Sequence, residues 1–216
     1  MSIIQNTDDM IYVHNVMRQA LSGHHRLFTE VAATSPTHRD AVHQYYHSIL
    51  ALIHSHHSAE DALLLPLLIA RAQPEEKAQV ELGMSQHEDV HRLLDQAQAQ
   101  LAAWQEQGDP GAQAQLLATL DALALSFGQH SQHEESQVLP LCRRYIEEAE
   151  WRQLPGYTLT RLKGNVLMMI IGMVRDAFND DFRHAMDSNM PPPLKQAWLQ
   201  DGQPMYRKQK ELLAAD

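Results

Sequence analysis

Histidine and carboxylate side chains stand at positions where the helical repeats of this chain call for buried apolar residues. His130 and Glu134 share one helix face with apolar residues, in steps of three and four: Leu116, Leu120, Leu123, Phe127, His130, Glu134 and Leu141. His56 and Glu60 do the same in a second stretch: Ile49, Ile53, His56, Glu60, Leu63 and Leu67. Burying a neutral polar group without a partner costs roughly 2–7 kcal/mol, and an ionised carboxylate costs more. These side chains therefore need a shared partner.

Two further stretches carry histidine on an apolar face. One reads Val80, Met84, His87, His91 and Leu94, and the other reads Met10, His14, Met17 and Leu21. Imidazole and carboxylate groups are ligands for iron, zinc, manganese and cobalt, so converging groups of this kind can share a cation. The predicted metal ligands are His14, His56, Glu60, His87, His91, His130 and Glu134.

An internal repeat supports this interpretation. The stretch with His56, Glu60 and Leu65–Pro66–Leu67 recurs as His130, Glu134 and Leu139–Pro140–Leu141, each element displaced by 74 residues. His14 precedes His56 by 42 residues and His87 precedes His130 by 43. The repeat predicts two helical hairpins that face each other across a pseudo-twofold axis. It breaks at one point, because His91 follows His87 by four residues whereas Arg18 follows His14, so one metal should have fewer protein ligands.

The elements that must position these residues are four long helices. We expect them to span about residues 7–35, 38–72, 74–108 and 112–148, with Pro66 and Pro140 each kinking its helix or ending its regular part. Short breaks between long amphipathic helices predict an all-α fold, an antiparallel up-down-up-down four-helix bundle with a C-terminal helical extension. Residues 1–150 would form the bundle and residues 151–216 an appendage.

The appendage has a different composition from the bundle. Residues 1–150 carry 8 basic and 20 acidic side chains, whereas residues 151–216 carry 9 and 7. Its Met168, Met169, Met173 and Trp198 would pack on the bundle, or form a surface for a protein partner or for self-association. We expect packing in preference to a partner surface.

Bulk composition excludes several classes of protein. The formal charge is −10 and the bundle is strongly acidic, which argues against nucleic acid as a partner. The most apolar run, residues 166–174, is shorter than the roughly 20 residues that span a bilayer, so no membrane association is expected. A single cysteine, Cys142, excludes an intrachain disulfide, and the start of the chain lacks the features of a secretory signal. We expect a cytoplasmic protein.

Helical spacing leaves alternative ligand residues on two of the predicted helices. On the second helix, His57 with Asp61 competes with His56 with Glu60, and we prefer the latter because its register continues through Leu63 and Leu67. On the fourth, Glu134 lies about 40° round the helix from His130 and Glu135 about 140°, which favours Glu134. The remaining histidines of the second helix should lie on its outer, solvated face: His43, His47, His54 and His57. His24 and His133 are candidates for supporting the ligands.

The ordered set of His14, His56 with Glu60, His87 with His91, and His130 with Glu134 resembles the hemerythrin-like (HHE cation-binding) family over roughly residues 8–150. The resemblance implies a four-helix bundle that holds two iron ions, a non-haem di-iron centre with an oxo or hydroxo bridge. On that basis His87, His91 and His130 would hold one iron, His14 and His56 the other, and Glu60 and Glu134 would bridge them. One iron would keep an open position for dioxygen. The oxygen carriers of the family use an aspartate five residues after the fourth-helix histidine, where this chain has Glu135.

The resemblance leads to one main function and two alternatives. The main expectation is binding of dioxygen or a related small ligand, for oxygen binding, sensing or protection against oxidative or nitrosative stress. The first alternative is a di-iron enzyme that acts on peroxide or nitric oxide, with Tyr12 or Arg18 as a nearby proton donor. The second is an iron-responsive adaptor or iron-handling protein that works through residues 157–216.

Overall fold

The computed structural model describes residues 3–4 and 6–214, and within them the chain is all-α. Apart from helices, this part of the chain contains one isolated bridge, between Ile3 and Glu147. No helix among the described residues is long and apolar enough to cross a membrane. The expected fold class is therefore confirmed at the level of helical structure.

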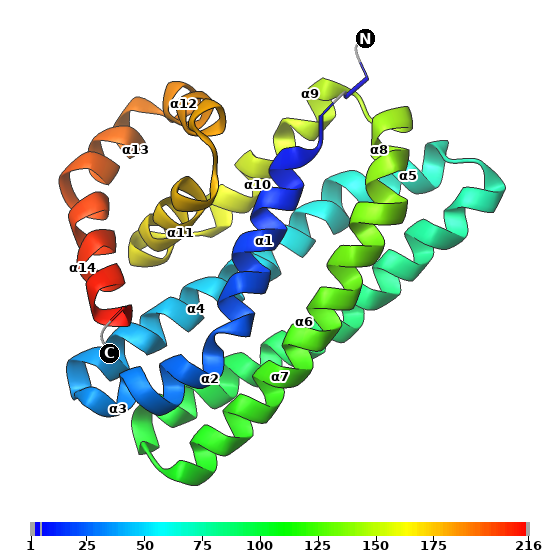
Figure 1. Ribbon diagram of the computed structural model, residues 1–216. Coiled ribbons are helices and arrows are strands. Elements are labelled where there is room, and N and C mark those ends of the chain that lie inside the picture. The colour runs from blue at the N-terminus through cyan, green and yellow to red at the C-terminus, as the bar shows by residue number, and fades with distance from the viewer. Residues whose placement is uncertain (1–2, 5, 215–216) are drawn as a thin grey trace.

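Four long helical segments form the body of the protein, and successive segments run in opposite directions (Figure 1). The first contains α1 (Asp8–Ser22), α2 (His24–Arg26), the π-helix η1 (Leu27–Val31) and α3 (Ala32–Thr34). The second contains α4 (Pro36–Ala59), the π-helix η2 (Glu60–Leu64) and α5 (Leu65–Arg71). The third is α6 (Pro74–Gln107), and the fourth contains α7 (Pro110–His133), the π-helix η3 (Glu134–Val138) and α8 (Leu139–Tyr145). Helix α1 packs on α4 and α7, and α6 packs on the same two helices.

Local sequence signals explain where these segments begin and end. Ser35 caps α4 by accepting a hydrogen bond from the backbone N–H of His38, and Pro36 occupies the first turn. Gly108 ends α6 in the left-handed conformation, at φ 68°, which favours glycine. Asp109 then caps α7 by accepting from the N–H groups of Gly111 and Ala112.

Two of the π-helical turns, η2 and η3, repeat with the sequence. Helix η2 (Glu60–Leu64) and helix η3 (Glu134–Val138) are displaced by the same 74 residues as the motifs around them. Each lies directly before the leucine–proline pair that opens α5 or α8. A proline cannot donate to the carbonyl four residues earlier and its ring clashes with that carbonyl, and a widened turn accommodates both effects. The expected interruption at Pro66 and Pro140 is confirmed.

The π turn of the second segment also corrects the predicted core. The expected stripe continued to Leu63 and Leu67, but both are only partly buried, and Leu64 and Leu68 are buried in their place. A π turn holds about one residue more than an α turn, so every later side chain moves to the position that its neighbour would have had. Beyond Glu60, the buried positions predicted from the spacing of an ideal α-helix are therefore wrong by one residue.

The stripe of α6 is also displaced from the predicted one. Met84 is 42% exposed, whereas the buried residues follow a regular three-and-four spacing: Val80, Gly83, His87, Val90, Leu94, Ala97, Leu101 and Trp104. His87 lies within this stripe. His91 lies on the same flank of the helix as Met84 and is half-buried.

The remaining helices follow the fourth segment: α9 (Glu148–Trp151), α10 (Gln153–Arg161), α11 (Gly164–Ala177), α12 (Asp180–Asn189), α13 (Pro192–Ala197), the π-helix η4 (Trp198–Gly202) and α14 (Gln203–Leu213). Helix α11 packs on α1 and α4, and α14 packs on α4. Met169 and Met173 are buried in the same apolar cluster as the helices of the body. Trp198 is buried too, in a smaller cluster to which Met168 belongs. The division of the chain at residue 150 stays a prediction.

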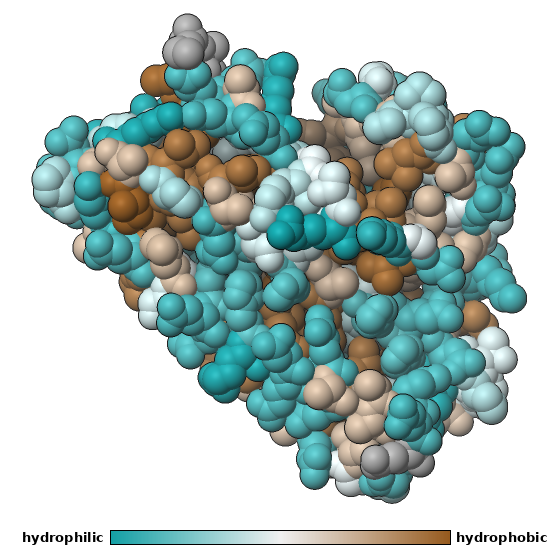
Figure 2. All heavy atoms as spheres, turned by 180° about the vertical axis from the view of Figure 1, so that it is seen from behind, coloured by the Kyte–Doolittle hydropathy of each residue, from teal (hydrophilic) through white to brown (hydrophobic). Residues whose placement is uncertain are grey.

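The surface offers apolar residues in separate places. The face drawn in Figure 2 is mostly hydrophilic, with apolar patches between hydrophilic side chains. Large exposed apolar residues of the described chain belong to several elements: Ile3, Leu82, Met84, Leu125 and Leu199.

Candidate metal centre

Six of the seven predicted ligands meet in the interior between the four segments. They are all at most 6% exposed: His14, His56, Glu60, His87, His130 and Glu134. Helix α1 supplies His14, α6 supplies His87, and the ends of α4 and α7 supply His56 and His130. The two glutamates are each the first residue of a π turn, Glu60 of η2 and Glu134 of η3. π turns often occur at functional sites because they redirect side chains.

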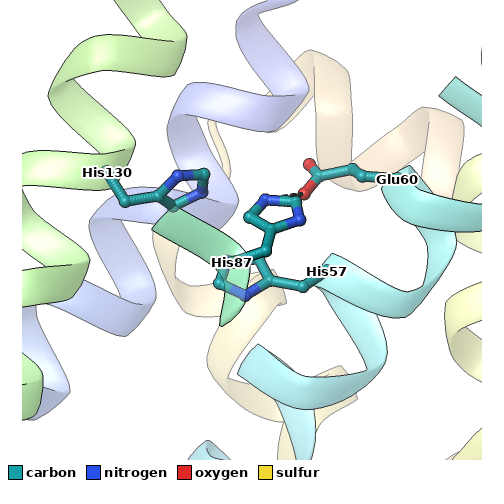
Figure 3. A group of neighbouring side chains, drawn as sticks. All are labelled: His57, Glu60, His87 and His130. Atoms are coloured by element: carbon teal, nitrogen blue, oxygen red, sulfur yellow. Dashed lines mark ion pairs between the residues drawn. The ribbon is translucent and has the colours of Figure 1, made fainter. Parts of the chain in front are cut away.

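The donor atoms form two groups that share one residue. His57, Glu60, His87 and His130 make one group, drawn in Figure 3 and called here the His87 group. His14, His56, Glu60 and Glu134 make the other, called here the His14 group. Within each group the ligand atoms lie within 4.8 Å of one another. Glu60 belongs to both.

Individual distances resemble those between ligands of a common ion. Nε2 of His14 lies 3.0 Å from Nε2 of His56 and 3.3 Å from Oε2 of Glu134. Donors roughly 2.1 Å from a shared ion lie about 3.0–3.4 Å apart in octahedral or tetrahedral geometry. The observed separations therefore suit a cation among the donors.

Both glutamates span the two groups. Glu60 places Oε1 3.2 Å from Nε2 of His56 and Oε2 3.5 Å from Nε2 of His87, so its two oxygens face different groups. Oε2 of Glu134 lies 3.3 Å from Nε2 of His14 and 3.5 Å from Nε2 of His130. A carboxylate in such a place can bridge two adjacent ions.

His57 is the residue that sequence reasoning missed. We expected it on the solvated face of its helix, but it is 0% exposed, and its ring stacks on that of His87 at 4.1 Å. The reason is that α4 is covered by α1, α6, α10 and α11 and buries a wide face. A signal did exist, since the buried residues Leu50, Ile53, His57 and Leu64 also follow helical spacing.

His91, the seventh predicted ligand, lies outside both groups. It is half-buried on the flank of α6, and its ring centre is 6.2 Å from that of His87 and 5.2 Å from that of His54. Its Nε2 is buried and makes no hydrogen bond within the described chain. Position therefore distinguishes His91 from the other six predicted ligands.

Carboxylates next to the two glutamates orient two of the histidines. Asp61 accepts a hydrogen bond from Nδ1 of His87 at 2.7 Å, and Glu135 accepts one from Nδ1 of His14 at 3.0 Å. These contacts place the proton on Nδ1 and leave Nε2 of each ring as a donor for a metal. The alternative carboxylates from the sequence, Asp61 and Glu135, thus support ligands and belong to neither donor group, whereas His57, the histidine paired with Asp61, belongs to the His87 group.

Burial shifts several pKa values of the centre, although at His14 the contacts with Glu134 and Glu135 outweigh burial and raise the pKa. Burial lowers the pKa of His130 to about 3, and lowers the pKa values of His56 and His57 well below their ordinary value, with neighbouring histidines adding to the effect. Burial, and next the adjacent Glu134 carboxylate, raise the pKa of Glu60 well above its usual range. Burial acts against the charged form of Glu134 as well, but the adjacent His14 ring lowers its pKa. Neutral histidine and ionised Glu134 are the states that bind metal.

Several of these buried atoms have no hydrogen-bond partner in the described chain. They include both ring nitrogens of His57 and His130, both carboxylate oxygens of Glu60, and Oε2 of Glu134. Buried polar groups are normally paired, and leaving one unpaired costs about 1–3 kcal/mol. The unpaired atoms lie where the two donor groups converge, so the residues present fit metal ions.

The two histidines that we considered as supports lie elsewhere. Nε2 of His133 is 2.9 Å from the backbone carbonyl of Gln79 on α6, and His133 belongs to neither donor group. His24 contacts the carbonyl of Leu21 and the carboxylate of Asp121. His54 and His47 are exposed, as expected, and His43 is partly buried.

Comparison with known proteins gives a family for this arrangement. The sequence matches the family described as hemerythrin HHE cation binding domain over residues 5–142, a range that contains all the donors described above. Searches of curated proteins and of solved structures gave no match. Because the family match covers more than half of the 216 residues, the chain belongs to the hemerythrin HHE cation-binding domain family.

Proposed function

We propose that this protein is a non-haem di-iron protein that binds dioxygen or a related small ligand. The observation that carries the proposal is the pair of donor groups that share Glu60. One carboxylate common to two groups suits two ions at close distance. The contacts among the four helical segments support an antiparallel up-down-up-down bundle as the frame.

The residues divide between two irons. His57, His87 and His130 would hold one, His14 and His56 the other, and Glu60 and Glu134 would contribute to both. This assignment differs from the one based on sequence by the exchange of His91 for His57. It is supported by the burial of His57 and by its two unpaired nitrogens.

Iron in this setting would supply reversible electron transfer to a small ligand. Five histidines and two carboxylates leave the site less anionic than carboxylate-rich di-iron oxidases, and neutral ligands stabilise high-valent iron less well. The chain itself excludes bulk water by burying all seven residues, and holds the donor rings through Asp61 and Glu135. These properties favour binding over oxidation of a substrate.

The proposal is tested by loading the protein with ferrous iron without air and recording its visible spectrum as oxygen is admitted and then removed. We expect two irons per chain and an absorption band that appears and reverses. His130→Ala should lower the iron content, whereas the exposed His47→Ala should not change it. Irreversible oxidation, or iron content that is the same in both variants, would contradict the proposal.

One contact favours the enzyme alternative. Arg18 donates hydrogen bonds to Glu135 at 2.7 Å and to Ser131 at 2.8 Å, and Glu135 contacts Nδ1 of His14. Arg18 is partly exposed, so this chain of contacts connects the surface with a ligand and could orient a proton donor for peroxide or nitric oxide chemistry. Tyr12 is a weaker candidate, since its ring packs against Phe178 and Phe182 of the C-terminal helices.

Turnover by the iron-loaded protein distinguishes this alternative. Iron-dependent disproportionation of peroxide, or consumption of nitric oxide, that falls in Arg18→Gln at unchanged iron content would support it. No turnover in the loaded wild-type protein would remove it. Arg18→Gln keeps a polar side chain of similar length while it removes the charge.

A further inference from the structure

A second cluster of metal-binding side chains lies away from the centre. His24 and His25 stand at the start of α2, and Asp121 comes from the adjacent helix α7. Oδ1 of Asp121 lies 3.1 Å from Nε2 of His24 and 3.0 Å from Nε2 of His25. His24 is ten residues beyond His14, which corresponds to about 15 Å along a helix, so the cluster is separate from the centre.

A neutral His24 ring carries one N–H, but each of its two nitrogens faces a hydrogen-bond acceptor. Its Nδ1 lies 2.6 Å from the carbonyl of Leu21. A carbonyl oxygen only accepts hydrogen bonds, so Nδ1 must carry the proton. Nε2 then presents a lone pair to the carboxylate of Asp121, and two acceptors face each other at 3.1 Å.

A cation between the two facing acceptors would relieve this contact. His24 is 3% exposed, and its ring centre is 4.4 Å from that of His25. A divalent cation between Nε2 of His24, Nε2 of His25 and the carboxylate of Asp121 relieves the contact without charging either ring. A backbone carbonyl on the other ring nitrogen, as at Leu21, is the usual support for a histidine that binds metal.

We propose that His24, His25 and Asp121 bind one divalent transition-metal ion of the zinc class. Two imidazoles and one carboxylate suit zinc, and water would complete its coordination. His25 and Asp121 have exposed side chains, 57% and 55%, so an ion reaches the cluster directly from solvent. The ion would connect the junction of α1 and α2 to α7; α1 carries His14 and α7 carries His130.

Zn²⁺ binding by the full chain tests the proposal. The protein is first loaded with iron, then dialysed against Zn²⁺, and bound zinc is counted by elemental analysis. We expect one zinc per chain beyond the iron content. His25→Ala and Asp121→Asn, which change exposed side chains and leave buried His24 in place, should each weaken zinc binding by about tenfold or more.

A matched control uses another histidine pair. His43 and His47 stack on α4 with ring centres 6.1 Å apart, but they belong to none of the groups of three or more potential metal ligands in the described chain. The double variant His43→Ala with His47→Ala should bind zinc as the wild type does. Zinc should also raise the melting temperature of the wild type and not that of Asp121→Asn. No additional zinc, undiminished binding in both cluster variants, loss in the control, or equal melting shifts would each overturn the proposal.

Discussion

The two halves of the internal repeat hold equivalent supporting carboxylates, but the side chains next to these carboxylates differ. Asp61 and Glu135 occupy equivalent positions and accept hydrogen bonds from equivalent histidines, His87 and His14. Next to them, His57 of the first half corresponds to Ser131 of the second, since the two are separated by the same 74 residues. His57 is a free nitrogen donor, whereas Ser131 accepts a hydrogen bond from Arg18.

Helices α1 and α6 show the same exchange. Arg18 follows His14 by four residues and His91 follows His87 by four. One side of the centre therefore has two further histidines, and the other has a serine bound to an arginine. A duplicated frame thus carries two unequal groups of side chains: one with an additional histidine nitrogen, the other with a hydrogen-bonded serine and arginine.

Removal of all metal should have the largest effect, because both halves then leave their donors unpaired. A ligand present at 1,000 times its Kd stabilises the folded state by about 4 kcal/mol. We expect at least this difference in the free energy of unfolding between loaded and chelator-treated protein, measured by denaturant titration. Equal unfolding midpoints would mean that the buried donors are satisfied without metal.

Glu60→Ala removes the one residue common to both donor groups. It should bring the iron content from two per chain to below one, because each ion loses a ligand. Glu81→Ala, at an exposed position of α6, is the matched control and should leave the content unchanged. If Glu60→Ala retained one full iron, the two groups would not depend on a shared carboxylate.

His57→Ser tests the asymmetry directly, because it gives the first half the residue of the second. We expect iron affinity of the His87 group to fall by more than roughly 100-fold, the upper end for residues that only support a ligand. His91→Ala should have a smaller effect, since His91 lies outside both groups. If an iron titration showed a larger loss of affinity for His91→Ala than for His57→Ser, the assignment of His91 as a ligand, based on sequence, would be preferred.

Acid should destabilise the metal-free protein through its buried histidines. Folding lowers the pKa values of His56, His57 and His130, the last to about 3, so the unfolded state binds more protons than the folded state below about pH 6.5. Each of these histidines contributes its full amount to the free energy of unfolding above the histidine pKa of the unfolded chain. As the pH falls below that value, the contribution of each decreases by roughly 1 kcal/mol per pH unit. The raised pKa of Glu60 opposes one of the three above the ordinary carboxyl pKa.

The free energy of unfolding should therefore fall between pH 6 and pH 5, with a steeper slope in the wild type than in His57→Ser. Denaturant titrations of both proteins at a series of pH values measure it. An equal slope in the two proteins would show that His57 is charged in the folded metal-free state.

The smallest effects should come from the supporting carboxylates. Asp61→Asn and Glu135→Gln each weaken a hydrogen bond to Nδ1 of a ligand, and we expect about tenfold weaker iron binding in both. Because Asp61 and Glu135 are equivalent, the two variants should affect opposite donor groups, which iron titration followed by absorption would resolve. An effect in only one variant would mean that the two carboxylates do not play equivalent roles, although their positions in the repeat are equivalent.

Much of this protein followed from its sequence. Helical spacing identified the inward positions of His14, His56, Glu60, His130 and Glu134, because an α-helix repeats with a fixed period and buried polar groups interrupt an apolar stripe. The repeat at 74 residues predicted two equivalent halves, and the two prolines predicted where the regular α-helix is interrupted. These properties are local, so the order of residues determines them.

Tertiary structure alone decided the rest. His57 is inside because other helices cover a wide face of α4. Which group each oxygen of Glu60 faces, and the meeting of His24 with Asp121, depend on contacts between helices far apart in the chain. Periodicity gives the direction of a side chain relative to its own helix, whereas the neighbour that it meets depends on how helices pack.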